Sequence, residues 1–259
     1  MTQWLGNGSV GDDTFDKFYS SIVPALVSSV EASEKMKHAG SALLDRVGVP
    51  FFFHHSRKKE ISFSSLCPQP AILLTHSQAG QFGWILADAR PSKVKAIIAI
   101  EPTGPPFTNA IFPPLTPARP YGLTDIPLAF SPPIQSAADL QTEVVSSSPN
   151  FTCIQQTTPP RKLVNLDNVR VLVITSESGY HSMYDACTVE FLRSAGVSVD
   201  HIRLEDVGIH GNGHMMFMEK NNLQIADEVV GKWLIRLFNH FITPGRSYDN
   251  FFRRFIYLE

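Results

Sequence analysis

The stretch LLTHSQAGQFGW (Leu73–Trp84) joins a short apolar run to a helical pattern. The run PAILL at its start is typical of a buried strand, and GQFGWILADAR after it is typical of a helix. Ser77 stands at the turn between the two. A serine on a sharp strand-to-helix turn can be a nucleophile, and the usual pattern there is G-x-S-x-G; here Thr75 and Ala79 occupy the glycine positions. The local pattern leaves two interpretations open, a nucleophile or a serine that caps a helix.

The chain on both sides of this turn alternates between strand and helix patterns. Val94–Ile100 is a continuous β-branched run, as expected for a strand buried on both faces of a parallel sheet. The predicted strands are Ala71–Thr75, Val94–Ile100, Val169–Thr175 and Val199–Leu204. The predicted helices are Asp13–Leu26, Ser28–Val47, Gln78–Ala89, Met183–Ala195 and Asp227–Phe238. This order predicts an α/β fold with a mostly parallel sheet and helices on both faces.

Three segments depart from this alternation, although we expect one domain over residues 1–259. Residues 102–160 are rich in proline and predict a lid or cap excursion over the sheet, with a short helix around Ala137–Val145. Residues 49–69 show neither period and are interpreted as an anomalous insertion. The segment 236–259 is more basic and aromatic than a last helix requires, and it is interpreted as an atypical tail.

Composition excludes several classes of function. The formal net charge is −2 and the pI is about 6.5, so nothing indicates a nucleic-acid partner. No apolar run approaches the roughly 20 residues of a membrane span, and the first residues lack the pattern of a signal peptide, which leaves localisation open. No C-x-x-C or G-x-G-x-x-G motif is present, so we expect neither a metal nor a cofactor. Cys153 and Cys187 either form a disulfide or remain two buried thiols.

A nucleophilic serine needs a base, and the base needs an acid that orients it. His214 lies in a glycine-rich loop after the last predicted strand and is the favoured base, with His210 of the same loop as its rival. His76 is interpreted as structural, and His181 as a residue that lines the pocket. The base and the acid are expected in loops at the carboxyl ends of the strands, because ligands bind there in parallel sheets.

Two glutamates are candidates for the acid. Glu101 directly follows the strand Val94–Ile100, and Glu177 follows the strand Val169–Thr175. The common hydrolase arrangement places the acid after the later strand, which favours Glu177. The order of serine, acid and histidine along the chain holds for both residues, so spacing alone does not choose between them.

Three motifs together resemble a microbial esterase family of the α/β-hydrolase superfamily, found in fungi and bacteria. They are THSQAG, the stretch EPTGPPF that begins at Glu101, and GNGHMM around His214. In that family the acid follows the sixth strand of the sheet. The resemblance therefore implies a catalytic triad of Ser77, Glu101 and His214, and it leaves Glu177 as the alternative acid.

The resemblance implies a carboxylic ester hydrolase that acts on a small-molecule ester through an acyl-enzyme. The backbone N–H of Gln78 is then expected to supply one oxyanion donor. No H-G loop that could supply the second donor precedes Ser77, so the chain is expected to lack the first strands of the sheet and to have impaired activity. The alternative is a non-catalytic α/β-hydrolase-like binding protein. The oligomeric state is left open.

Overall fold

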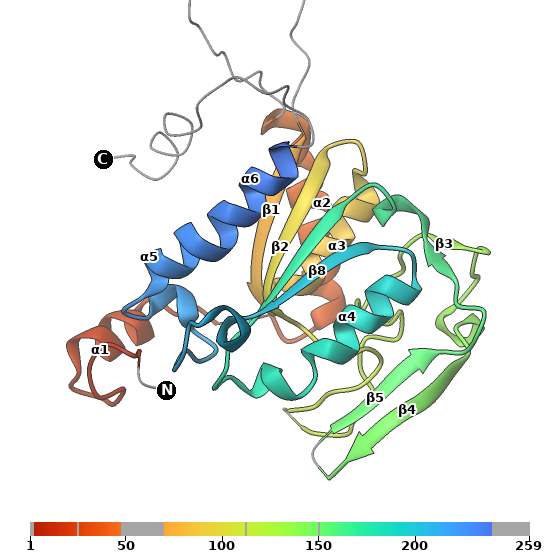
Figure 1. Cartoon of the computed structure of the whole chain (residues 1–259). Coiled ribbons are helices and arrows are strands. Elements are labelled where there is room, and N and C mark those ends of the chain that lie inside the picture. Colours follow the sequence, from red (N-terminus) through yellow and green to blue (C-terminus); the bar gives the residue numbers. More distant parts are fainter. Residues whose placement is uncertain (1–2, 25, 48–69, 112, 150, 240–259) are drawn as a thin grey trace, which may run out of the picture.

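A four-stranded parallel sheet forms the centre of the molecule in the computed structural model, which describes residues 3–24, 26–47, 70–111, 113–149 and 151–239. Its strands are β1 (Ala71–Ser77), β2 (Val94–Pro102), β7 (Arg170–Thr175) and β8 (Ser198–Arg203), in the order β1-β2-β7-β8 (Figure 1). Every pairing is parallel. Each predicted strand is confirmed, with ends that differ by a few residues. In the described part of the chain β1 lies at one edge, where Leu74 is exposed.

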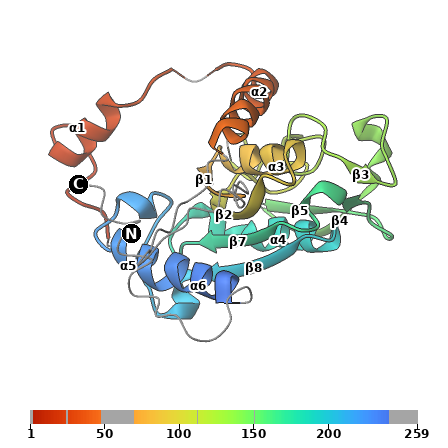
Figure 2. The same ribbon diagram turned by 90° about the horizontal axis from the view of Figure 1, so that it is seen from above.

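The two faces of the sheet carry separate hydrophobic cores. Ile97 and Ala99 of β2 pack with α3 (Gly80–Ala89) and α4 (Asp185–Ser194). Ile98 and Ile100 point to the opposite face, where they pack with the helical stretch from Asn222 to Asn239. That stretch consists of α5 (Asn222–Ile225), a π-helical turn (Ala226–Gly231) and α6 (Lys232–Asn239). Figure 2 shows α3 and α6 on opposite sides of the sheet, so the prediction of helices on both faces is confirmed.

The first two helices match the prediction unequally. α2 (Ser29–Val47) packs against α3, and the Ser28 hydroxyl accepts a hydrogen bond from the Glu31 amide, as a cap would. α1 (Asp13–Ser20) ends before the predicted Leu26 and buries none of its residues. Pro24 explains why the helix does not continue to Leu26, because a proline disfavours helical conformation in the residue before it and cannot donate a helical hydrogen bond.

The proline-rich excursion contains small antiparallel sheets instead of the predicted helix. Residues Ala137–Asp139 form only a 3-10 turn, and Thr142–Ser148 (β4) pairs with Phe151–Gln156 (β5). The prediction of a helix around Ala137–Val145 is therefore wrong. Val144 and Val145 are β-branched and favour the extended conformation that the hairpin gives them. The remaining short elements are β3 (Phe130–Ser131), β6 (Lys162–Leu163) and the 3-10 turns Val164–Leu166, Tyr180–Met183, Leu204–Val207 and Met216–Met218.

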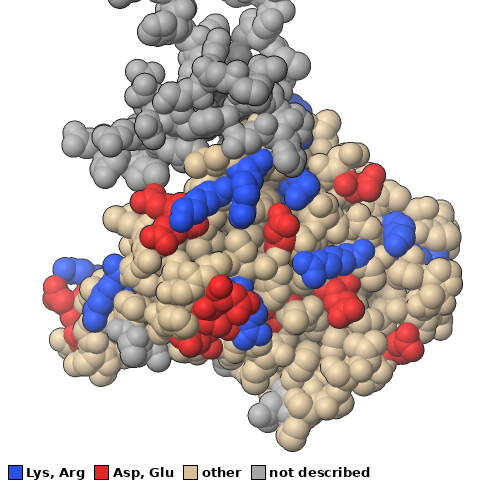
Figure 3. Space-filling view, in the orientation of Figure 1, with Lys and Arg blue, Asp and Glu red and all other residues tan. Residues whose placement is uncertain are grey.

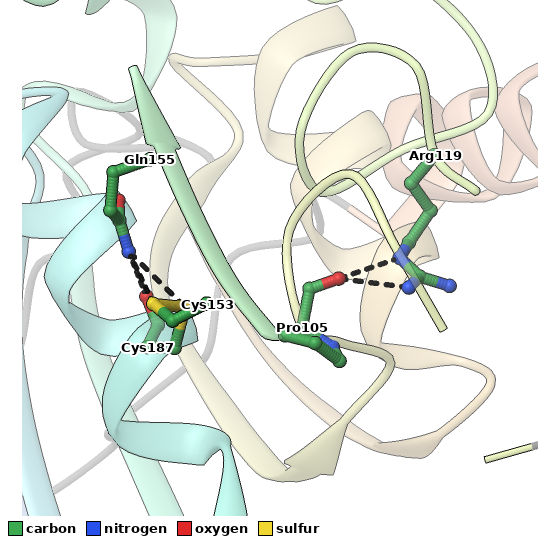
Figure 4. The surroundings of a disulfide bond; sticks show 5 residues. All are labelled: Pro105, Arg119, Cys153, Gln155 and Cys187. Atoms are coloured by element: carbon green, nitrogen blue, oxygen red, sulfur yellow. Dashed lines mark hydrogen bonds between the residues drawn. A yellow bond between two sulfur atoms is a disulfide. The ribbon is translucent and has the colours of Figure 1, made fainter. Parts of the chain in front are cut away.

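A disulfide between Cys153 and Cys187 links β5 of this hairpin to α4 (Figure 4). The Gln155 side chain donates a hydrogen bond to the Cys187 carbonyl at 2.8 Å. Of the two alternatives for these cysteines, the structure has the disulfide. Such crosslinks persist in oxidising environments.

We expect the double variant Cys153→Ser/Cys187→Ser to be less stable by about 3–4 kcal/mol, because the disulfide closes a loop across a sequence separation of 34 residues. Chemical denaturation of the two proteins measures this difference. Reductant should destabilise the wild type and leave the double variant unchanged. Equal unfolding free energies of the oxidised wild type and the variant would contradict the expectation.

Two predicted segments lie wholly or mostly outside the described residues. The anomalous insertion 49–69 is one, and the atypical tail 236–259 is described only to Asn239, where α6 ends. Within the described ranges, none of the helices combines the length and the hydropathy that a membrane crossing requires. Acidic and basic side chains are interspersed on the face that Figure 3 shows, which agrees with the small net charge.

Candidate active site

Ser77 lies at the sharp turn between β1 and α3. Its φ of 53° is in the left-handed region, which is strained for a residue with a side chain and is often found at functional turns. Gly80 allows the turn to be this tight, because a Cβ there would come within 2.7 Å of the Pro102 Cα atom in β2. The close approach therefore depends on Gly80. This explains how the turn forms although Ala79 occupies one of the usual glycine positions.

The Ser77 hydroxyl contacts the ring of His214. Ser77 Oγ lies 2.9 Å from His214 Nε2, although 137 residues separate them in sequence. His214 belongs to the loop between β8 and α5, and its side chain is 19% exposed, so the ring is accessible from outside. A neutral imidazole with its proton on Nδ1 can accept the serine proton in this position.

Two side chains, those of His76 and Glu219, hold the backbone around His214 through hydrogen bonds. His76 Nε2 donates to the His214 carbonyl oxygen at 2.8 Å, which agrees with the structural interpretation of His76. Burial is the largest influence on the pKa of His76 and lowers it, so this ring stays neutral. The buried carboxylate of Glu219 accepts hydrogen bonds from the Asn212 side chain and from the Gly213 amide at 2.6 and 3.0 Å. The loop is therefore fixed immediately before the histidine.

Glu101 lies on the other side of the imidazole. Its Oε2 atom is 2.5 Å from His214 Nδ1, and the residue is fully buried at the end of β2. Its Oε1 atom accepts hydrogen bonds from the Ser176 amide at 2.8 Å and from the Ser176 hydroxyl. Burial raises the pKa of Glu101, but the hydrogen bond from His214, the charge of His181 and the Ser176 hydrogen bonds together lower it below the usual value. An ionised Glu101 orients the imidazole and stabilises its protonated form.

The alternative acid and base form a separate pair. Glu177 Oε1 lies 3.2 Å from His210 Nδ1, and Glu177 Oε2 accepts a hydrogen bond from the Gly211 amide at 2.8 Å. Both side chains are exposed, at 39% for Glu177 and 62% for His210. In the structure Glu101 therefore contacts His214, and Glu177 contacts His210.

Four residues from the loop after β7 and the start of α4 complete the surroundings of His214. They are Tyr180, His181, Tyr184 and Asp185. Of these, only His181 was predicted from the sequence to line the pocket. The His181 ring is buried and stacks parallel to the His214 ring, with 4.8 Å between their centroids. His181 Nδ1 is 2.9 Å from the Asp185 carboxylate, and its Nε2 is 3.0 Å from the Tyr184 hydroxyl. Tyr180 contacts His214 directly. The chain gives no periodic signal for these residues, because an irregular loop brings them together.

Ligand-type atoms of Glu101, His181 and His214 lie within 4.8 Å of one another, as a metal site would require. However, both ring nitrogens of each histidine already have hydrogen-bond partners. For His214 these are Glu101 and Ser77, and for His181 they are Asp185 and Tyr184. A bound cation would have to displace these contacts, so the arrangement fits proton transfer better than metal binding.

A cavity of about 600 Å³ opens in front of Ser77. Gln78, Tyr180 and His181 line it from the loops of the sheet, which agrees with the predicted place of His181. Arg119 and other residues of the proline-rich excursion also line it. Arg119 is itself buried and donates two hydrogen bonds to the Pro105 carbonyl oxygen, at 3.2 and 2.8 Å (Figure 4). The excursion and the candidate nucleophile thus line the same cavity, which is large enough for a small substrate.

The chain is similar to a fungal protein described as "Probable secreted lipase phiG", from Fungal sp. (strain ATCC 74256). The two are 43% identical over 236 residues, which is 90% of this chain and 58% of the relative. The chain therefore spans a little more than half the length of this curated relative. No family model matches the chain.

Two of the similar solved structures are esterases. A structure described as that of a novel bacterial esterase is 21% identical, with a TM-score of 0.38, over 65% of this chain and 38% of the other. A carboxylesterase structure from the thaumarchaeon Nitrososphaera gargenis is 13% identical, with a TM-score of 0.42, over 80% and 73% of the two chains.

Proposed function

We propose that the chain is a serine carboxylic ester hydrolase of the α/β-hydrolase superfamily, with Ser77, His214 and Glu101 as its catalytic triad. The observation that carries the proposal is the continuous series of contacts from the Ser77 hydroxyl through both ring nitrogens of His214 to the Glu101 carboxylate. Such a series is the requirement for activating a serine at neutral pH.

In the proposed acylation step, Ser77 Oγ forms a bond to the ester carbonyl carbon while its proton moves to His214 Nε2. The ester C–O bond then breaks, and the leaving alcohol oxygen takes this proton. Water attacks the acyl-enzyme in the second step and gives its proton to His214. The bond between the acyl carbon and Ser77 Oγ then breaks. Ser77 Oγ recovers the proton from His214 as the carboxylic acid is released.

The negative charge of each tetrahedral intermediate requires hydrogen-bond donors. We propose the backbone N–H of Gln78 as one donor, because Gln78 follows the nucleophile at the turn and lines the cavity. Loss of one such donor costs about 10²–10³ in rate in other serine hydrolases. If the Gln78 amide acts without a second oxyanion donor, we expect the chain to hydrolyse esters at a low but measurable rate.

We further propose that residues 1–259 form a single domain in which the excursion 102–160 acts as a cap over the substrate. Support comes from Ile111, Pro117 and Arg119 of this segment, which line the cavity. The Cys153–Cys187 disulfide and the Gln155 side chain attach the same segment to α4. The acyl and alcohol groups of the substrate would then lie between the cap and the loops of the sheet.

Hydrolysis of p-nitrophenyl butyrate by the purified chain tests the proposed function. We expect release of p-nitrophenolate above the background rate, and loss of this activity after treatment with a fluorophosphonate. A folded chain that hydrolyses no short-chain ester and does not react with the fluorophosphonate would contradict the proposal. It would favour the non-catalytic binding protein instead.

A further inference from the structure

The hydroxyl of Tyr180 lies at the atoms between which the proposed proton transfer occurs. It is 3.3 Å from His214 Nε2, the atom that also contacts Ser77 Oγ at 2.9 Å. A hydrogen bond with the Ser77 side chain also influences the pKa of Tyr180. The same tyrosine lines the cavity in front of Ser77. A phenolic hydroxyl therefore occupies the side of the imidazole from which a substrate oxygen must approach.

The surroundings of Tyr180 fix the position of its ring. The ring packs against the rings of His214 and His181, with centroid distances of 4.9 and 4.6 Å. His181 is in turn buried and hydrogen-bonded to Asp185 and Tyr184. A long tyrosine side chain that is packed in this way loses little further entropy when it binds a substrate.

The backbone before Tyr180 is fixed against the acid of the triad. Gly179 is required there, because a Cβ at this position would come within 2.6 Å of Glu101 Oε1 and 2.4 Å of Ser176 Oγ. Ser176 also donates its amide hydrogen to Glu101. Ser176 thus connects the segment that carries Tyr180 to the carboxylate that orients His214, because its hydroxyl also accepts a hydrogen bond from the Gly179 amide at 3.1 Å.

The environment keeps the Tyr180 hydroxyl protonated. Burial raises the pKa of Tyr180, and the negative charge of Glu101 raises it further, whereas the hydrogen bond with Ser77 acts in the opposite direction. The net direction is upward. At neutral pH the side chain is therefore a neutral group that can donate one hydrogen bond.

The Tyr180 hydroxyl could donate its hydrogen bond either to the oxyanion or to the leaving alcohol oxygen. The position of Tyr180 next to His214 Nε2 decides between these two roles. The oxyanion of the intermediate is assigned to the Gln78 amide at the turn after Ser77. The leaving alcohol oxygen, in contrast, must come close to His214 Nε2 to receive its proton, and the attacking water must be at the same place to lose one. Tyr180 is next to Nε2, so its hydroxyl is suited to the alcohol and water oxygens.

We propose that Tyr180 is a catalytic residue whose hydroxyl donates a hydrogen bond to the leaving alcohol oxygen during acylation and contacts the attacking water during deacylation. This inference rests on the proposed ester hydrolase function. The ester C–O bond breaks as the alcohol oxygen receives its proton from His214 Nε2. Tyr180 keeps its own proton throughout and stabilises the negative charge that builds up on the alcohol oxygen.

The leaving group decides how much this contact contributes. An alkoxide is a much stronger base than p-nitrophenolate, so it gains more from a hydrogen bond in the transition state. Removal of the Tyr180 hydroxyl should therefore slow acylation by an alkyl ester more than acylation by a p-nitrophenyl ester. The value of kcat/KM reports the steps through acylation, which separates this effect from deacylation of an acyl-enzyme that is common to both substrates.

The experiment compares Tyr180→Phe with the wild type on ethyl butyrate and p-nitrophenyl butyrate. We expect kcat/KM to fall about 10²-fold for ethyl butyrate and less than about 5-fold for p-nitrophenyl butyrate. The matched control is Tyr184→Phe, since the Tyr184 hydroxyl contacts His181 and not His214. This control should change both kcat/KM values by the same factor.

The outcomes separate the two proposals. An active wild type with equal losses on both esters in Tyr180→Phe, or with no loss, overturns the role of Tyr180 and leaves the ester hydrolase function standing. A folded wild type that hydrolyses neither ester overturns the proposed function, and this inference with it. A loss on the alkyl ester that exceeds the loss on the p-nitrophenyl ester at least 10-fold supports both.

Discussion

Replacement of Ser77 by alanine is expected to lower kcat for p-nitrophenyl butyrate by about 10⁴- to 10⁶-fold. The variant removes the only atom that forms the acyl-enzyme in the proposed mechanism. His214, Glu101 and the turn would stay in place, because alanine is smaller than serine and the turn depends on Gly80. Initial rates of p-nitrophenolate release, measured at equal concentrations of folded protein, test this expectation.

Ser29→Ala provides the control for Ser77→Ala. Ser29 also lines the cavity, from the beginning of α2, and it is not part of the proposed triad. We expect its kcat to stay within about 3-fold of the wild type, because kcat falls when an interaction made in the transition state is removed and Ser29 has no such role in the proposed mechanism. An active wild type whose Ser77→Ala variant keeps its activity would show that another residue is the nucleophile.

Replacement of Glu101 by glutamine is expected to lower kcat by about 10³- to 10⁴-fold. The amide has nearly the same shape, but it cannot stabilise the protonated imidazole of His214. Its NH₂ group also favours the wrong tautomer of the ring when it faces Nδ1. The effect should be large here because the carboxylate is fully buried and 2.5 Å from His214 Nδ1, where solvent cannot replace it.

Glu177→Gln is the matched control, because it makes the same chemical change in the other candidate acid. Glu177 is exposed and contacts His210 and the Gly211 amide, so we expect less than about a 3-fold change in kcat. Measurement of both variants under one set of conditions decides between the acids. A large loss in Glu177→Gln together with a small loss in Glu101→Gln would contradict the assignment and restore the later strand as the position of the acid.

Periodicity predicted the central sheet well because buried parallel strands form continuous apolar runs. Val94–Pro102 is buried along nearly its whole length, and the sequence signal there is correspondingly strong. The prediction failed where local patterns are weak, as at Ala137–Val145, which forms part of a hairpin and not a helix. The early end of α1 follows from Pro24, which could have been considered from the sequence.

The candidate site was predicted only in part by the residues themselves. Ser77 and His214 could be selected from their places after strands, but spacing left Glu101 and Glu177 open, and only the family resemblance favoured Glu101. The side chains of the two glutamates point in different directions from the ends of their strands, and only that of Glu101 reaches His214. Glu101 has a φ of 42°, and this turn of the backbone is not readable from sequence. The contact of Tyr180 with His214 has the same origin, because it depends on an irregular loop.

The site of attachment of a fluorophosphonate is the most direct test of the central claim, that the Ser77 hydroxyl is activated by His214 and Glu101. The purified wild-type chain would be treated with the reagent, digested and analysed by mass spectrometry, so that the modified residue is identified. We expect one adduct, on Ser77, which forms at a much lower rate in the Glu101→Gln variant. An active chain that carries the adduct on another residue, or an adduct on Ser77 that forms equally fast without the Glu101 carboxylate, would contradict the claim.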